Sequence, residues 1–179
     1  MIKLNKFLIA GLFALIAASA SGSSVELTED QEYFLSILHP KAKDKFRQFV
    51  IRSKRMGWDV IFTSTYRTFA KQAQLKAQNS QNASPGYSYH NYGLAIDFNL
   101  RNEQGVQMKK ATSKSEWLST GVPQMAKSLG FVWGGDFATY HDPVHLDMRE
   151  WYDINTLYNK AIAQFGSDWS NIQGNQVNI

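Results

Sequence analysis

The sequence contains no cysteine and only four prolines among its 179 residues. Without cysteine the chain cannot form disulfides, Cys-based zinc sites, thiol nucleophiles or Cys-linked lipid anchors. Any metal must therefore be held by histidine and carboxylate side chains. No repeat with a period of about 20–50 residues is visible, which excludes a repeat architecture. The hydrophobic content of 44% and the aromatic content of 13% suit one globular domain and exclude a disordered chain or a coiled coil.

The first twenty residues have the pattern of an export signal. Lys3 and Lys6 precede an uncharged run over 7–18, and small residues lead to Ala20. We expect a signal peptide over 1–20 with cleavage after Ala20, and hence a periplasmic or secreted protein. A run of this length spans only about 18 Å as a helix, against roughly 30 Å of membrane hydrocarbon. A releasable membrane anchor is the alternative, and no stable span is expected after cleavage.

The charge of the mature chain is small. Without Lys3 and Lys6 the net charge falls from +4 to +2, which does not indicate a nucleic-acid partner. We expect a monomer with one domain over 21–166. The segment 167–179 is expected to be a polar and loose C-terminal tail.

Hydrophobic periodicity and capping residues predict an α+β domain, with a small and mostly antiparallel sheet flanked by helices. Capping boxes at Thr28 with Gln31 and at Ser113 with Glu116 mark two helix starts. The further helices are expected over about 41–56, 68–78, 123–130 and 153–165. Strands are expected over 58–64, 94–100, 131–133 and 144–148.

Two of these strands carry metal-competent side chains on their polar faces. Asp97 lies on the polar face of 94–100, and His145 lies on that of 144–148. His90 lies in the loop that leads into the first of these strands. If the two strands pair in antiparallel fashion, His90, Asp97 and His145 converge.

Two imidazoles and one carboxylate leave the fourth position of a tetrahedral zinc ion open, which is typical of a catalytic zinc site. Asp142 lies three residues before His145, in a loop where it would act as general base. Arg67 lies between a strand and a helix, from where it would hold a substrate carboxylate or an oxyanion.

Two interpretations are open for other residues near this group. The segment 133–137 is either a core aromatic followed by a turn or a wall of the cleft. Asp136 either bonds a metal-ligating imidazole or caps that turn. His39 and His141 are expected at the surface.

These motifs resemble those of a known family, the LAS zinc peptidases, which is the lysostaphin-type, D-alanyl-D-alanine and sonic-hedgehog-like group. The resemblance covers about Leu35 to Met148. The matching motifs are S-x-H-x-x-G-x-A-x-D over 88–97, D-x-x-H over 142–145, Tyr66-Arg67 followed by Gln72, and W-G-G-D-F over 133–137. There are departures: Lys71 stands where a Glu is common, and Leu-Asp follows His145 where Phe-Glu is frequent.

The resemblance implies a hedgehog/D-Ala-D-Ala peptidase-like fold and a zinc ion (Zn2+). The implied metal ligands are His90, Asp97 and His145. The implied catalytic residues are Asp142 and Arg67, and the residues assigned to substrate binding are Arg67, Gln72, Ser88 and Trp133.

The resemblance also implies a peptidoglycan stem peptide as substrate. The 133–137 turn and the helical lead-in look closer to the L-alanyl-D-glutamate branch, so we expect an endolysin-like hydrolase of the L-Ala–D-Glu bond, of bacterial or phage origin. The alternatives are a D-Ala-D-Ala carboxypeptidase or dipeptidase on the same scaffold, and a non-catalytic zinc module that binds the cell wall. Asp142 and Arg67 argue against the last, because a structural metal needs neither.

Overall fold

The computed structural model describes residues 24–179, so the predicted signal peptide lies outside the described part of the chain. The helices are α1 (Glu29–Ser36), α2 (Pro40–Arg55), α3 (Phe69–Gln78), α4 (Lys114–Ser119), α5 (Val122–Ser128) and α6 (Ile154–Phe165). The strands are β1 (Asp59–Ser64), β2 (Ala95–Arg101), β3 (Gln107–Met108), β4 (Val132–Trp133) and β5 (His145–Asp147). Short 3-10 helices are η1 (Tyr89–Tyr92), η2 (Gly134–Asp136) and η3 (Gly174–Gln176). Among these elements, no helix has the length and hydrophobicity needed to span a membrane.

The strands form one sheet in the order β1-β2-β5-β4, with β3 paired to the far end of β2. Every pairing is antiparallel. β2 is therefore the central strand, because it pairs with three others. The α+β class with a small antiparallel sheet is confirmed.

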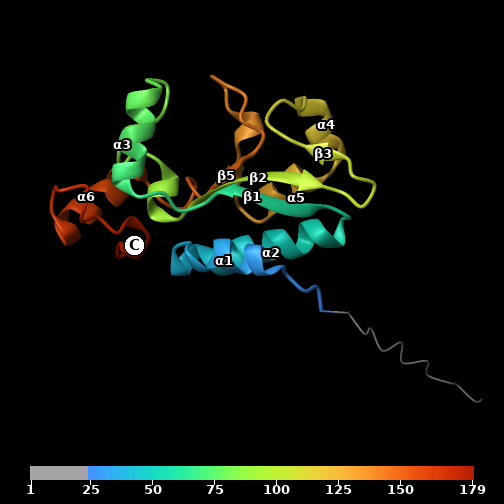
Figure 1. Cartoon of the computed structure of the whole chain (residues 1–179), viewed down its shortest axis with the longest axis horizontal. Helices are drawn as coiled ribbons and strands as arrows, with labels where there is room; N and C mark the ends of the chain where they lie inside the picture. The colour runs from blue at the N-terminus through green and yellow to red at the C-terminus, as the bar shows by residue number, and fades with distance from the viewer. Residues whose placement is uncertain (1–23) are drawn as a thin grey trace, which may run out of the picture.

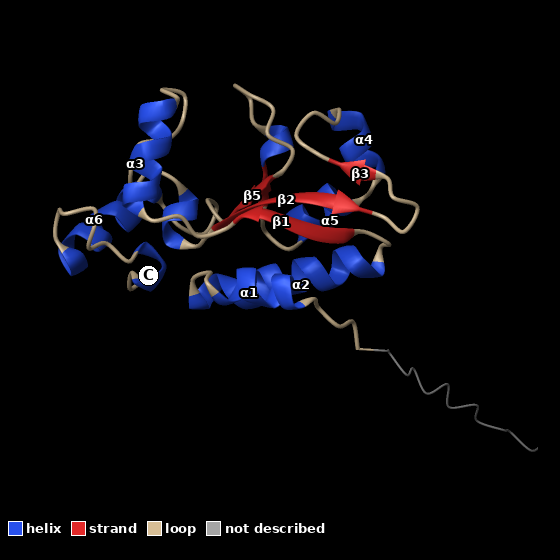
Figure 2. Cartoon of the chain, in the orientation of Figure 1, coloured by secondary structure: helices blue, strands red, loops and turns tan. Residues whose placement is uncertain are grey.

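Helices α1 and α2 lie side by side along one face of the sheet (Figure 1) and both contact β1. Helices α3 and α6 gather at one end, and α4 lies with β3 at the other (Figure 2). Aromatic side chains join α2 to the sheet. The Phe49 ring lies 5.2 Å from that of Phe98 on β2, and Phe46 stacks on Phe131 at 4.6 Å. This core buries alternate residues of β2 and leaves Asp97 on the opposite face.

The predicted helix starts form as the sequence indicates. Thr28 and Gln31 close a complete capping box on α1, and Ser113 and Glu116 do the same on α4. Asp153 accepts a hydrogen bond from the backbone N–H of Thr156 and so caps α6. These interactions are local, which explains why the sequence alone could place them.

The segment 167–179 is packed against the domain, in contrast to the loose tail that its composition indicates. Ile172 and Val177 are each only 1% exposed, and η3 contacts η1. Two isolated apolar residues among polar ones show neither a helical nor a strand period, so their burial depends on contacts with distant parts of the chain.

The expectation that His39 lies at the surface is wrong, because the residue is only 5% exposed. Its Nδ1 accepts a hydrogen bond from the backbone N–H of Lys41 at 3.1 Å and thereby caps α2. This leaves Nε2 to donate to the carbonyl of Val177 at 3.0 Å. The bond accepted by Nδ1 requires the neutral imidazole, and burial lowers the pKa of His39 because it disfavours the charged ring.

This pKa makes stability depend on pH. Above the usual pKa of about 6.5 the ring is neutral whether the chain is folded or unfolded. As the pH falls below that value, the unfolded chain binds a proton first, and the free energy of unfolding falls by up to about 1.4 kcal/mol per pH unit until the folded pKa is reached. Urea titrations between pH 7.5 and 5 should show a steeper loss for the wild type than for His39→Gln.

The exposed His141 provides the matched control, since His141→Gln should keep the wild-type slope. The other histidines are present in all three proteins, so the difference isolates His39. Parallel pH profiles for the wild type and His39→Gln would contradict the assignment.

Candidate metal centre

The sheet register brings Asp97 and His145 together. The two residues are directly paired across β2 and β5, so their side chains project from the same face. The distance from His145 Nδ1 to Asp97 Oδ1 is 2.9 Å. The predicted antiparallel pairing is therefore confirmed, and it supplies two of the three expected ligands from regular strands.

His90 reaches the same point from η1, the 3-10 turn that precedes β2. Gly93 ends this turn with a φ of +64°, a conformation that glycine adopts without strain. A Cβ at Gly93 would lie only 2.5 Å from the backbone nitrogen of His39. The glycine thus lets the chain turn tightly into β2 and bring the imidazole back over Asp97.

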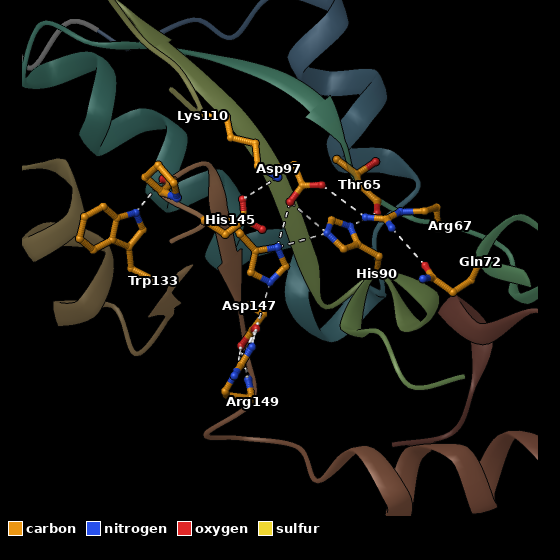
Figure 3. A network of polar contacts seen from close by, with 12 residues as sticks. Thr65, Arg67, Gln72, His90, Asp97, Lys110, Trp133, His145, Asp147 and Arg149 are labelled. Atoms are coloured by element: carbon orange, nitrogen blue, oxygen red, sulfur yellow. Dashed lines mark hydrogen bonds and ion pairs between the residues drawn. The ribbon is translucent and has the colours of Figure 1, made fainter. Parts of the chain in front are cut away.

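The three ligand atoms form a nearly equilateral triangle (Figure 3). His90 Nε2 lies 3.2 Å from Asp97 Oδ1 and 3.3 Å from His145 Nδ1, which completes the triangle with the 2.9 Å edge above. Two ligands of a tetrahedral zinc ion with bonds of about 2.0–2.1 Å lie about 3.3–3.4 Å apart. The donor set and the spacing fit a zinc ion with one open position.

The outer nitrogen of each imidazole is held by an acceptor. His90 Nδ1 donates to the carbonyl of Thr65 at 2.6 Å, and His145 Nε2 donates to Asp147 Oδ2 at 3.0 Å. The strand β1 has a register shift between Phe62 and Ser64, just before Thr65, which is a common device next to functional sites. In the neutral rings the outer nitrogens carry the protons and the inner nitrogens present lone pairs. An inner N–H that donates to Asp97 is present only when a ring is protonated.

The electrostatics of the centre favour a positive charge. Burial lowers the pKa of His90. Burial acts in the same direction on His145, but hydrogen bonds to Asp147 and Asp97 outweigh it and raise the pKa of His145 to about 9. Burial alone would raise the pKa of Asp97, yet the hydrogen bonds with the two histidines lower it. Groups that stabilise a proton in this way also stabilise a metal cation.

Asp142 lies in the loop between η2 and β5. Its backbone N–H donates to the carbonyl of Gly134 at 3.1 Å, and its carbonyl accepts from the N–H of His145 at 3.1 Å. A Cβ at Gly134 would lie 2.3 Å from the carbonyl oxygen of Asp142, so this close approach needs glycine. The carboxylate Oδ1 of Asp142 is buried and has no hydrogen-bond donor, with Lys110 Nζ 3.6 Å away. The carboxylate of this loop therefore has the exposed Lys110 as its ion-pair partner.

Arg67 bridges Asp97 to α3. Its Nη2 lies 3.3 Å from Asp97 Oδ2, and its Nη1 donates to Gln72 Oε1 at 3.1 Å. Burial lowers the pKa of Arg67, while the charges of Asp97 and Asp142 act against this. The guanidinium is thus paired with Asp97, and the charge of Asp142 also acts on it.

Two residues that the sequence assigns to substrate binding are instead buried. Trp133 and Gln72 are each only 1% exposed, so neither offers a surface to a substrate. The Trp133 indole donates to the carbonyl of Pro143 at 2.7 Å and holds the Asp142 loop, and Gln72 holds Arg67. Ser88 is partly exposed at the start of η1, and its assignment stays a prediction.

Asp136 does not bond an imidazole. It forms ion pairs with Lys114 at 2.7 Å and Lys127 at 2.8 Å on the exposed surface. His141 is exposed, as expected.

The residue that supports the imidazole is Asp147, which sequence reasoning missed. Asp147 is fully buried and also pairs with Arg149, whose Nη2 lies 2.5 Å from Asp147 Oδ2. The spacing gave a signal: residues i and i+2 of a strand share a face, so Asp147 had to lie beside His145. For Thr65 the sequence offers no such signal, because this residue acts through its backbone carbonyl, which every residue has.

Asp147→Asn should weaken zinc binding by about 10- to 100-fold, because the imidazole loses the carboxylate that fixes its orientation and increases its basicity. Competition with a chromogenic chelator would measure this. Asp136→Asn is a matched control that removes an exposed carboxylate and should leave the affinity within about twofold. An Asp147→Asn protein with wild-type affinity would show that His145 is oriented by other contacts.

Comparison with known proteins places this geometry in a family. A sequence profile of the family described as D-alanyl-D-alanine carboxypeptidase matches residues 81–148. The matched range contains the three expected ligands and Asp142.

Two curated relatives are similar to a large part of the chain. The peptidoglycan L-alanyl-D-glutamate endopeptidase CwlK of Bacillus subtilis (strain 168) is 37% identical over 126 residues, which cover 63% of this chain and 74% of CwlK. The L-alanyl-D-glutamate peptidase of Listeria phage A118 is 33% identical over 112 residues, and the alignment covers 63% of this chain but only 38% of that protein.

Solved structures with similar arrangements include the L-Ala D-Glu endopeptidase ChiX of Serratia marcescens, with a TM-score of 0.48 and 22% identity over 72% of this chain and 92% of ChiX. VanYB in complex with D-alanine-D-alanine gives a TM-score of 0.43 and 19% identity, covering 68% of this chain and 77% of VanYB. The sequence alignment with CwlK carries the assignment. This chain belongs to the LAS-type zinc peptidases, the family of D-Ala-D-Ala carboxypeptidases and L-alanyl-D-glutamate peptidases.

Proposed function

We propose that this chain is an exported zinc endopeptidase that hydrolyses the L-Ala–D-Glu bond of peptidoglycan stem peptides. The observation that carries the proposal is the triangle of His90, Asp97 and His145, with the carboxylate of Asp142 on the adjoining loop. The choice of bond is supported by two relatives named for L-alanyl-D-glutamate cleavage. Export is supported by the sequence of residues 1–20 and by a substrate that lies outside the cytoplasmic membrane.

His90, Asp97 and His145 would hold the zinc ion. When bound, zinc supplies Lewis-acid chemistry that polarises a carbonyl and lowers the pKa of water from 15.7 to about 7. The carboxylate of Asp142 takes a proton from the attacking water and delivers it to the nitrogen of the leaving amine. Asp142 can serve in both steps because a carboxylate can accept a proton and return it, and its ion-pair partner Lys110 is an exposed side chain 3.6 Å away.

Arg67 would stabilise negative charge at the reacting carbonyl or bind a substrate carboxylate. Its orientation is fixed by Gln72 on one side and Asp97 on the other, so little side-chain entropy is lost when a substrate binds. The same contacts keep the guanidinium next to the metal ligands. Donors that are already oriented toward developing charge stabilise a transition state without reorganisation.

The second candidate is a D-Ala-D-Ala carboxypeptidase, which the description of the matching family favours. A synthetic stem peptide with an L-Ala–D-Glu bond near one end and D-Ala–D-Ala at the other separates the two activities. Mass spectrometry of the products should show cleavage between L-Ala and D-Glu and an intact D-Ala–D-Ala end. Release of free D-Ala without the other cut would favour the carboxypeptidase, and no cleavage by the zinc-loaded protein would favour a binding module.

Asp142→Asn tests the general base. Because Asp142 is not one of the three ligands, zinc affinity should stay within about twofold of the wild type. The rate of stem-peptide cleavage should fall by about 10²- to 10⁴-fold, the usual contribution of a positioned acid–base group. His141→Gln changes the exposed neighbour and should leave both quantities unchanged. Full activity of Asp142→Asn would remove this residue from the mechanism.

A further inference from the structure

Residues 172–179, here called the brace, pack against η1, the turn that carries His90. Ile172 and Val177 of the brace are buried, and between them Gly174 lies against the backbone of Asn91. A Cβ on Gly174 would lie 1.9 Å from the carbonyl oxygen of Asn91 and 2.9 Å from its carbonyl carbon. The contact is therefore one of backbone against backbone, directly after the metal ligand in the chain.

The brace also connects to the end of the same turn through His39. The His39 side chain donates to the carbonyl of Val177 at 3.0 Å, while its backbone N–H donates to the carbonyl of Gly93 at 3.1 Å. Asn175 adds a hydrogen bond to the carbonyl of Ile37 at 3.0 Å, just before His39. The brace is thus fixed to the same short stretch of chain that holds Gly93.

The other side of the turn is held by the segment that follows β1. The backbone N–H of Arg67 donates to the carbonyl of His90 at 2.9 Å, and the side chain of Asn91 donates to the carbonyl of Arg67 at 2.9 Å. His90 is the one metal ligand that does not come from a strand. Its position therefore depends on what encloses its turn, which is the Arg67 segment on one side and the brace on the other.

We propose that the brace is a positioning element that sets the location of His90 for metal binding, with Gly174 as the residue that makes this possible. The inference rests on the metal site of the proposed function. Atoms in contact lie about 3.5–4.0 Å apart, so a Cβ at Gly174 requires the backbones of Gly174 and Asn91 to separate by more than about 1 Å. Because buried Ile172 and Val177 anchor the brace on both sides of Gly174, the turn that carries His90 takes up this shift. Metal–ligand distances tolerate only about 0.2 Å, so a shift of this size at the neighbouring residue takes His90 Nε2 out of the coordination sphere.

Gly174→Ala in the full chain tests this, with Gln173→Ala as the matched control. Gln173 is the exposed preceding residue, and its side chain forms no hydrogen bond in the described structure. Competition with a chelator should show zinc affinity at least 10-fold lower for Gly174→Ala and within twofold of the wild type for Gln173→Ala. Wild-type zinc affinity in a folded Gly174→Ala protein would overturn the proposal.

Val177→Ala is a second, milder variant that loosens the brace without a clash. Hydrogen exchange of the zinc-loaded full chain would follow the amides of Asn91, Gly93 and Leu94, which donate within the turn. Exchange there should accelerate at least fivefold, while that of Phe98 on β2 should not change. Acceleration confined to residues 172–179 would overturn the proposal.

Neither measurement uses peptide hydrolysis, so the results distinguish a failure of the brace proposal from a failure of the proposed peptidase function. A wild-type protein that binds zinc but cuts no stem peptide would contradict the proposed function and leave the brace intact. If the wild type bound no zinc, the metal site itself would be refuted, and with it the role of the brace.

Discussion

The centre depends on one electrostatic constraint, the meeting of three electron-rich atoms within 3.3 Å of each other. With their outer N–H groups donated to Thr65 and Asp147, neutral His90 and His145 present lone pairs to each other and to Asp97. A neutral ring can turn its N–H inward only by leaving a buried acceptor unpaired, which costs about 1–3 kcal/mol, so an inner positive charge must come from a proton or a metal ion. The arrangement is stable only with a positive charge at its middle, so the surrounding fold selects for a cation.

The three residues of the centre are carried by segments of unequal rigidity. Asp97 and His145 lie on paired strands at the middle of the sheet, where the ladder fixes their separation. His90 lies on a 3-10 turn of four residues, which has little rigidity of its own. The contacts around that turn, from Arg67 on one side and from Gly174 and His39 on the other, replace the rigidity that a strand would give. Packing contacts distant from the three atoms thus help to position His90 in the proposed metal site.

The sequence predicts what short-range patterns determine. Alternation placed Asp97 and His145 on polar strand faces, and capping residues placed the starts of α1 and α4. What it could not predict depends on contacts between distant segments: His39 is buried because Val177 reaches it from 138 positions away, and Trp133 is buried although its motif also suited a cleft wall. The brace was missed for the same reason, since Ile172 and Val177 have no periodic neighbours.

The proposed metal ligands and the proposed proton acceptor are held by different parts of the structure. The ligands belong to β2, β5 and η1, whereas Asp142 belongs to a loop that is fixed by the indole of Trp133 and the close approach of Gly134. Such a loop can change in length and composition without disturbing the sheet. The sheet thus positions two of the three expected ligands, while the third ligand and the expected proton acceptor lie on segments that connect the strands. This division explains how one scaffold can serve peptidases that cut different bonds of the same stem peptide.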